Sequence, residues 1–225
     1  GRRAAAVTDE DAQIFEIMHR VLRPTSNCVA AGAFEGGHLA KMEQYAPAGT
    51  HFGFEPQPAQ FEGLVHAFPR ERTKLYNLAL SDHAGEIDFN VITNSPGYSS
   101  FYRRPEYPFE PEIRVIRVRT VALDDVLPPD VDIDYIKIDV EGAELLVLQG
   151  ARRTLATWRP FLIFEHGIEG SGPDAETVAI HQLLVRDLGM KLNSLPRFLA
   201  GQPPLSDDEF FAEVYGHHHW DFVAF

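Results

Sequence analysis

The chain has little cysteine and little positive charge. Cys28 is the single cysteine among 225 residues, which excludes an internal disulfide, and its apolar neighbours indicate a packing residue rather than a nucleophile. Lys and Arg total 20 against 33 Asp and Glu. The resulting net charge of -13 argues against a general surface for nucleic acid or for an anionic membrane, since both attract positive charge.

Long apolar runs and internal repeats are also absent. No run approaches the roughly 20 apolar residues that span a bilayer, and the N-terminus shows no secretory apolar region. We therefore expect a cytoplasmic protein with no nucleic-acid or membrane partner. Hydrophobic residues form 44% of the chain, enough for one core, so we predict a single domain over 1–225 with a helical extension at 1–24. The oligomeric state stays open.

Two groups of basic residues could form an anion site or a metal site, but the sequence favours another interpretation for each. Arg114, Arg117 and Arg119 alternate with apolar residues, which is typical of a strand with one solvated face and favours that interpretation over an anion site. The three histidines at 217–219 are adjacent, so in an extended segment they point to opposite faces. They do not predict a closed metal site by themselves.

The order of elements predicts an α/β fold. Thr8 and Asp11 resemble a capping box that opens a helix ending before Pro24. A last strand that closely follows its predecessor, without a helix between them, predicts an antiparallel hairpin edge. The expected strands are 28–31, 50–55, 75–80, 85–93, 115–121, 134–138, 161–165, 191–195 and 220–225, with helices after most of them and one capped by Asp174.

The segment 132–144 carries the most information. A run of β-branched and aromatic residues ends at Asp139, Glu141 and Gly142 follow at a turn, and apolar residues then recur at helical spacing from Leu145 to Leu155. Ligands of open α/β sheets lie outside the carboxyl ends of the strands, so Asp139 and Glu141 occupy positions where chemistry is expected. Asp139 has the alternative role of capping the next helix.

Two further segments suggest a nucleoside-containing ligand. Gly32 and Gly36 follow a strand, and glycine lets backbone amides approach a ligand closely, although such glycines are often only turn residues. The loop does not read G-x-G-x-x-G, which disfavours a dinucleotide. Glu55 ends the second strand about twenty residues later, where an acidic side chain accepts hydrogen bonds from ribose hydroxyls. Its alternative is a capping or surface role.

The chain resembles the FkbM family of S-adenosylmethionine-dependent O-methyltransferases. The resemblance is carried by KIDVEGAELLVLQGARRTL with the following Pro and FLIFEH, by the glycine loop and by Gly53-Phe54-Glu55-Pro56. It implies a Rossmann-like doubly wound sheet of the class I methyltransferase type, mostly parallel with an antiparallel C-terminal edge strand. The cofactor residues that it implies are Gly32, Ala33, Phe34, Glu35, Gly36, Glu55, Pro56, Ala79 and Asp139.

The sequence departs from the family pattern at Ala30. Related methyltransferases commonly carry an acidic residue there, which helps to hold the methionyl amino group. Asp139 and Glu35 are the residues that could compensate, and weaker cofactor binding or lost activity is the alternative outcome.

The sequence gives fewer signals for the residues that would bind the methyl acceptor. Residues 94–111 are rich in Pro, Tyr, Phe and Arg without regular periodicity, which predicts a lid or substrate loop, and Tyr98, Ser99 and Ser100 are its candidate substrate-binding residues. Methyl transfer to a hydroxyl requires the removal of one proton. The candidate catalytic residues are His166 as general base, or alternatively a satisfied loop histidine, together with Glu141 and Asp139.

Three function classes are compatible with these patterns. An O-methyltransferase that uses S-adenosylmethionine on a sugar or secondary-metabolite hydroxyl, with a small-molecule or glycan acceptor, explains all three segments together. A nicotinamide-dependent oxidoreductase fits the fold but lacks the dinucleotide fingerprint. A non-catalytic binding protein is suggested only by Ala30. A divalent metal held by carboxylates stays open as an alternative means of activating the acceptor.

Overall fold

The computed structural model describes residues 8–68, 71–103, 107–167 and 174–225. Residues 1–7 of the predicted extension and residues 104–106 of the predicted lid lie outside this part. Within it, no helix combines the length and the apolar character needed to cross a membrane.

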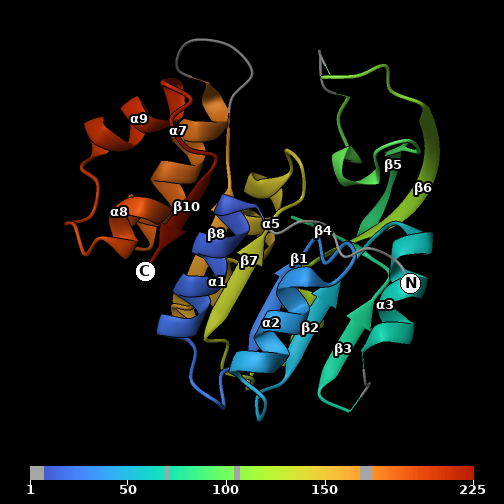
Figure 1. Ribbon diagram of the computed structural model, residues 1–225, viewed down its shortest axis with the longest axis horizontal. Helices are drawn as coiled ribbons and strands as arrows, with labels where there is room; N and C mark the ends of the chain where they lie inside the picture. The colour runs from blue at the N-terminus through green and yellow to red at the C-terminus, as the bar shows by residue number, and fades with distance from the viewer. Residues whose placement is uncertain (1–7, 69–70, 104–106, 168–173) are drawn as a thin grey trace.

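A seven-stranded sheet forms the centre of the molecule (Figure 1). Its order is β3-β2-β1-β7-β8-β10-β9, and each paired neighbour is parallel except at β10, which is antiparallel to both β8 and β9. The predicted doubly wound fold and its antiparallel C-terminal strand are therefore confirmed, with β9 as the outermost strand. The strands are β1 (Cys28–Ala31), β2 (His51–Phe54), β3 (Thr73–Tyr76), β7 (Tyr135–Ile138), β8 (Phe161–Glu165), β9 (Leu192–Ser194) and β10 (Asp221–Ala224).

Helices cover both faces of this sheet, which explains why strands such as β1 and β7 are buried at every position. Cys28 and Ala30 of β1 face one layer, and Val29 and Ala31 face the other. The first layer contains α1 (Asp9–Val21), α2 (Gly37–Tyr45), α3 (Pro58–Ala67) and α8 (Leu195–Leu199). The second contains α4 (Leu123–Val126), α5 (Glu144–Gly150), α6 (Arg152–Trp158), α7 (Ala175–His181), the π-helical turn η2 (Gln182–Asp187) and α9 (Asp207–Tyr215).

Helix α1 begins where the sequence predicts. Thr8 is its N-cap, and the Thr8 hydroxyl accepts a hydrogen bond from the amide of Asp11 while the Asp11 carboxylate accepts one from the amide of Thr8. Ile14, Ile17 and Met18 are fully or almost fully buried against the sheet. Asp174 likewise caps α7, as predicted.

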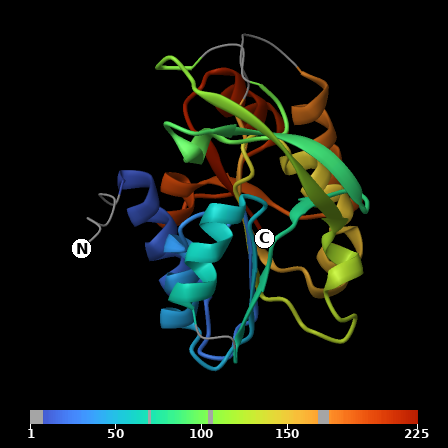
Figure 2. The same ribbon diagram turned by 90° about the vertical axis from the view of Figure 1, so that its right-hand side faces the viewer.

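A second sheet stands over one end of the first (Figures 1 and 2). Its order is β4-β6-β5, with β4 (Ala79–Ser81), β5 (Gly85–Ile92) and β6 (Ile113–Ala122). The single strand predicted at 75–80 is wrong, because the chain leaves the central sheet after Tyr76 and enters the second sheet at Ala79. Asn77 fixes this bend by donating from Nδ2 to the carbonyl oxygens of Glu55 (2.8 Å) and Pro56 (3.1 Å).

Two other expectations require correction. The helix predicted after Gly142 is interrupted at Ala151, which separates α5 from α6. The hairpin predicted without a helix is also wrong, because α8 and α9 lie between β9 and β10. A signal for α9 was available in the sequence, since Ser206 and Glu209 form a capping box.

Helix α5 packs so closely on β4 that only glycine fits at position 150. A Cβ atom there would lie 2.0 Å from the carbonyl oxygen of Ser81.

We expect Gly150→Ala to lower the free energy of unfolding by about 1 to 3 kcal/mol or more through overpacking. Gly63→Ala in α3, where nothing lies within 4 Å, is the matched control and should raise stability by about 0.5 to 1 kcal/mol. Urea denaturation measures both, and equal stabilities would contradict this close contact.

Candidate active site

The glycine loop after β1 is held against the turn after β7. Gly32 and Gly36 have φ angles of 78° and 87°, and Phe34 between them has a φ of 47°. A Cβ atom on Gly32 would lie 1.8 Å from the carbonyl oxygen of Asp139. Glycine is therefore required at position 32 both for backbone conformation and for this contact between two neighbouring strands.

Glu55 connects this loop to the end of β2. Its Oε2 accepts a hydrogen bond from the amide of Phe34 and its Oε1 accepts one from the amide of Gln57, both at 2.8 Å. The residue is only 2% exposed. Burial raises the pKa of Glu55, although these two amides partly oppose the shift. Each carboxylate oxygen keeps a second lone pair for a further donor.

A cavity of about 340 Å³ opens beside Glu55, at the carboxyl ends of the parallel strands. Its wall near β4 is apolar and is formed by Phe54, Leu78 and Leu80. Gly36 does not line it but packs against Phe68 behind the loop. The other residues predicted to bind a cofactor all line the cavity, namely Gly32, Ala33, Phe34, Glu35, Glu55, Pro56, Ala79 and Asp139. The cavity is also lined by Phe101 of the predicted lid and by residues that the sequence did not suggest, including Asp11, His38, Gln57 and Phe89.

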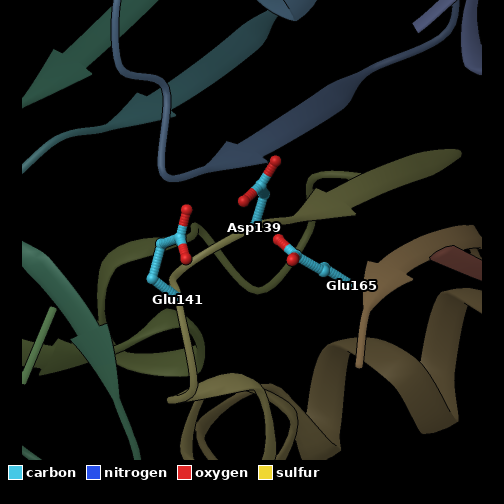
Figure 3. A group of neighbouring side chains, drawn as sticks. All are labelled: Asp139, Glu141 and Glu165. Atoms are coloured by element: carbon cyan, nitrogen blue, oxygen red, sulfur yellow. The ribbon is translucent and has the colours of Figure 1, made fainter. Parts of the chain in front are cut away.

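Three carboxylates lie close together at the carboxyl ends of β7 and β8 (Figure 3), and two of them, Asp139 and Glu141, line this cavity. One oxygen from each of Asp139, Glu141 and Glu165 lies within 4.8 Å of the others. Burial disfavours the Asp139 carboxylate, but the ammonium of Lys137 at 3.4 Å outweighs it and lowers the pKa of Asp139. Burial, followed by the charges of Asp139 and Glu141, raises the pKa of Glu165 well above its usual value.

These opposite pKa shifts mean that Asp139 loses its proton at a lower pH than Glu165 does, so the pair holds one proton between the two pKa values. Carboxylate oxygens are also the ligands that Mg²⁺ and Ca²⁺ prefer. The oxygens of Asp139, Glu141 and Glu165 are therefore the residues that could hold a divalent ion, with the Lys137 ammonium as a competing cation beside Asp139.

His166 is held in a fixed orientation by α7. Its Nε2 lies 2.7 Å from the Thr177 hydroxyl, and that hydroxyl donates to Asp174 at 2.5 Å. Because the hydroxyl proton goes to Asp174, Nε2 of His166 is the donor to Thr177 and Nδ1 retains the lone pair. The histidine is 4% exposed, and burial lowers its pKa.

His166 lines a second cavity, of about 180 Å³, next to the first. Glu141 lines both cavities, and Glu165 lines the second. The residues predicted to bind substrate divide between them. Ser99 lines the first cavity and Ser100 the second, whereas Tyr98 lines neither and makes edge contacts with the rings of Tyr107 and Phe109.

The described part of the predicted lid is tied to the second sheet. Ser99 Oγ accepts from the amide of Ile92 at 3.0 Å, and Ser100 and Asn90 exchange backbone hydrogen bonds. Asn94 contacts Glu110 and Glu112 across the base of the segment. These contacts place residues 99–103 beside both cavities, as a substrate loop requires.

Position 30 carries no negative charge, because an alanine stands there. Ala30 is buried in the layer that contains α1 and α2. Of the two residues that could compensate, Glu35 is exposed at the cavity wall and Asp139 is paired with Lys137.

Known proteins resemble this chain in sequence and in fold. A family model for the methyltransferase FkbM domain matches residues 30–192. A 2-O-methyltransferase, NoeI of Sinorhizobium fredii, is 30% identical over 158 residues, which are 64% of this chain and 65% of that protein. The crystal structure of methyltransferase FkbM from Methylobacillus flagellatus KT superposes with a TM-score of 0.54 at 16% identity, covering 91% of this chain and 44% of its own. The match therefore extends over less than two thirds of either relative's length.

The buried carboxyl of Glu144 should make the stability of the fold depend on pH. Its Oε1 accepts from the amides of Val140 and Gly142, both at 3.2 Å, and burial raises its pKa to about 7. A buried carboxyl with a raised pKa stabilises the fold below its usual pKa of 4.5 and loses that contribution as the pH rises through about 7. Glu144→Gln keeps the oxygen acceptor without the charge. It should gain on the order of 2 kcal/mol over wild type at mildly alkaline pH and nothing in acid.

Urea denaturation across this pH range tests the prediction, with the exposed Glu62→Gln in α3 as the control for loss of one negative charge. A constant difference between wild type and Glu144→Gln at every pH would show that Glu144 does not titrate in this way.

Proposed function

Because this chain belongs to the FkbM methyltransferase family, we propose that it transfers a methyl group from S-adenosylmethionine to a hydroxyl oxygen of a small-molecule or glycan acceptor. The observation that carries the proposal is the buried Glu55 carboxylate, anchored by two amides at the mouth of the first cavity. The nicotinamide alternative gains no support from the family or from the glycine loop.

The first cavity has a polar part at Glu55 and an apolar wall, and this combination supports a nucleoside-containing cofactor. The free lone pairs of Glu55 suit the two ribose hydroxyls, since a carboxylate accepts from both. The apolar wall at Leu78 and Leu80 suits a flat adenine ring. The methionyl portion would then extend over the Gly32 loop toward Asp139 and the end of β7.

The second cavity supports the acceptor. When bound, S-adenosylmethionine supplies an electrophilic methyl group, so the chain itself needs to position a hydroxyl oxygen and remove its proton. Glu141 lies at the boundary between the two cavities, where an acceptor hydroxyl would meet the cofactor. Nδ1 of His166 has the free lone pair of a general base, and a raised pKa prepares Glu165 to donate or share a proton.

Aromatic surfaces favour a sugar as the acceptor. Trp220 is 41% exposed and Tyr102 is 55% exposed, and both line the second cavity together with carboxylates that accept hydrogen bonds from hydroxyl groups. The Trp220 ring packs directly on Gly167, where a Cβ atom would lie 1.7 Å from the ring. A sugar ring presents apolar C–H faces to such rings and hydroxyls at its edge. The activity in the name of the 2-O-methyltransferase relative agrees with a hydroxyl acceptor.

Cofactor binding is tested through Glu55. In Glu55→Gln an amide group replaces a carboxylate that accepts from two backbone amides, and its NH₂ cannot accept from them or from ribose. We expect S-adenosylhomocysteine to bind roughly 10- to 100-fold more weakly by calorimetry. Glu62→Gln should bind like wild type. Saturable NADH binding by wild type, with no heat from S-adenosylhomocysteine, would reject the proposed cofactor.

The proton acceptor is tested through His166. His166→Ala should lower kcat by about 10² to 10⁴ and leave the dissociation constant of S-adenosylhomocysteine nearly unchanged. The neutral imidazole is the active form, so wild-type activity should rise with pH through a midpoint below 6.5, the ordinary pKa that burial lowers. Exposed His66 in α3 is the control, and His66→Ala should keep wild-type turnover.

A metal-assisted reaction predicts different results. Turnover retained by His166→Ala, with loss of activity on addition of a chelator and recovery with Mg²⁺, would assign proton removal to an ion held by Asp139, Glu141 and Glu165.

A further inference from the structure

The first turn of α1 closes one end of the first cavity. Asp11, at the third position of the helix, lines the cavity together with His38 from α2 and Asp139, which directly follows β7. We infer that Asp11 binds the ammonium group of the methionyl portion of S-adenosylmethionine and thereby supplies the negative charge that position 30 lacks. This inference rests on the proposed cofactor and adds a binding residue to it.

The position of Asp11 follows from the direction of the cavity. Glu55, directly after β2, and the apolar wall at Leu78 would hold the nucleoside half on one side. The opposite side lies over β7, because β1 separates β2 from β7 in the sheet. Helix α1 packs there in the same buried cluster as Tyr135 of β7 and Ile163 of β8, and Figure 1 shows it in front of these two strands. Asp11 therefore faces the methionyl end.

Among the residues that the structure describes, no lysine or arginine forms an ion pair with Asp11. Its Oδ2 accepts from the Thr8 amide at 3.3 Å, and its Oδ1 lies 3.4 Å from Nε2 of His38. Burial, followed by the charge of Lys137, lowers the pKa of His38 and so favours its neutral imidazole. By contrast, the ammonium of Lys137 already compensates Asp139. Asp11 would therefore offer a ligand ammonium at this end of the cavity a carboxylate that no described lysine or arginine pairs with.

The Asp11 carboxylate is also held in place before a ligand binds. The capping box with Thr8 fixes its side chain, and the buried residues Ile14, Ile17 and Met18 fix the helix. A preorganised charge binds without the cost of ordering a flexible side chain.

Asp11 lies outside the part of the chain that matches the family. That match begins at residue 30, and α1 ends at Val21. The ammonium contact would therefore be a feature of the segment that precedes the shared domain, compensating within this chain for Ala30.

The test compares two ligands and two matched variants. S-adenosylhomocysteine carries the ammonium, whereas 5′-methylthioadenosine keeps the nucleoside and the sulfur but lacks the amino-acid portion. Asp11→Asn keeps the oxygen that the capping box needs and removes the charge. Asp9→Asn makes the same change of charge at an exposed position in the same turn.

We expect Asp11→Asn to bind S-adenosylhomocysteine roughly 10- to 100-fold more weakly than wild type in calorimetry, because one charge-assisted contact is lost. Its affinity for 5′-methylthioadenosine should equal that of wild type, and Asp9→Asn should match wild type with both ligands. This pattern supports the inference, since a displaced helix would weaken both ligands together.

Three results would overturn it. Equal affinity of Asp11→Asn and Asp9→Asn for S-adenosylhomocysteine would reject Asp11 while leaving the proposed cofactor intact. Equal weakening of both ligands by Asp11→Asn would show that Asp11 only supports the cavity wall. If wild type binds neither ligand, the proposed cofactor itself is wrong, and the role of Asp11 fails with it.

Discussion

A buried ammonium in the central strand organises the rest of the site. Lys137 lies on β7 with its side chain 3% exposed, and its Nζ is 3.0 Å from Asp221 and 3.4 Å from Asp139. Burial favours the neutral amine, but these carboxylates outweigh it and raise the pKa of Lys137. Removing one partner of such a buried pair would leave an uncompensated charge. The ammonium therefore keeps Asp139 ionised, and the charge of Asp139 in turn helps to keep Glu165 protonated.

Much of the fold was predictable because local patterns and long-range packing agree. The capping box at Thr8, the apolar strands and the turn at Gly142 each have a local signal that the structure retains. The failures occur where tertiary contacts decide. Residues 75–80 read as one apolar run, and only the side chain of Asn77, bonded to the backbone after β2, shows where the chain changes sheets. The interruption at Ala151 has only Gly150 as a local signal, and an isolated glycine in a helical pattern lowers helix propensity without by itself predicting a break.

The sequence likewise predicted some residues of the candidate site and missed others. Residues at the ends of strands were found from the sequence because parallel strands bring their carboxyl ends together, which explains the meeting of Asp139, Glu141 and Glu165. Asp11 and the Asp174–Thr177–His166 chain were not found. Each depends on how a helix packs against the sheet, and sequence spacing carries no record of that geometry.

The arrangement of the two cavities restricts the chemistry that the site can perform. A group transferred between two ligands must cross the boundary between their binding places, and here Glu141 stands at that boundary with a φ of 60°. A non-glycine residue in this conformation is energetically costly and persists only where its surroundings hold it. The backbone at Glu141 is thus held in a strained turn at the same place where the cofactor and acceptor would meet. The conformation of this turn therefore determines where the Glu141 carboxylate lies relative to Asp139 and Glu165, since one oxygen of each group lies within 4.8 Å of the others.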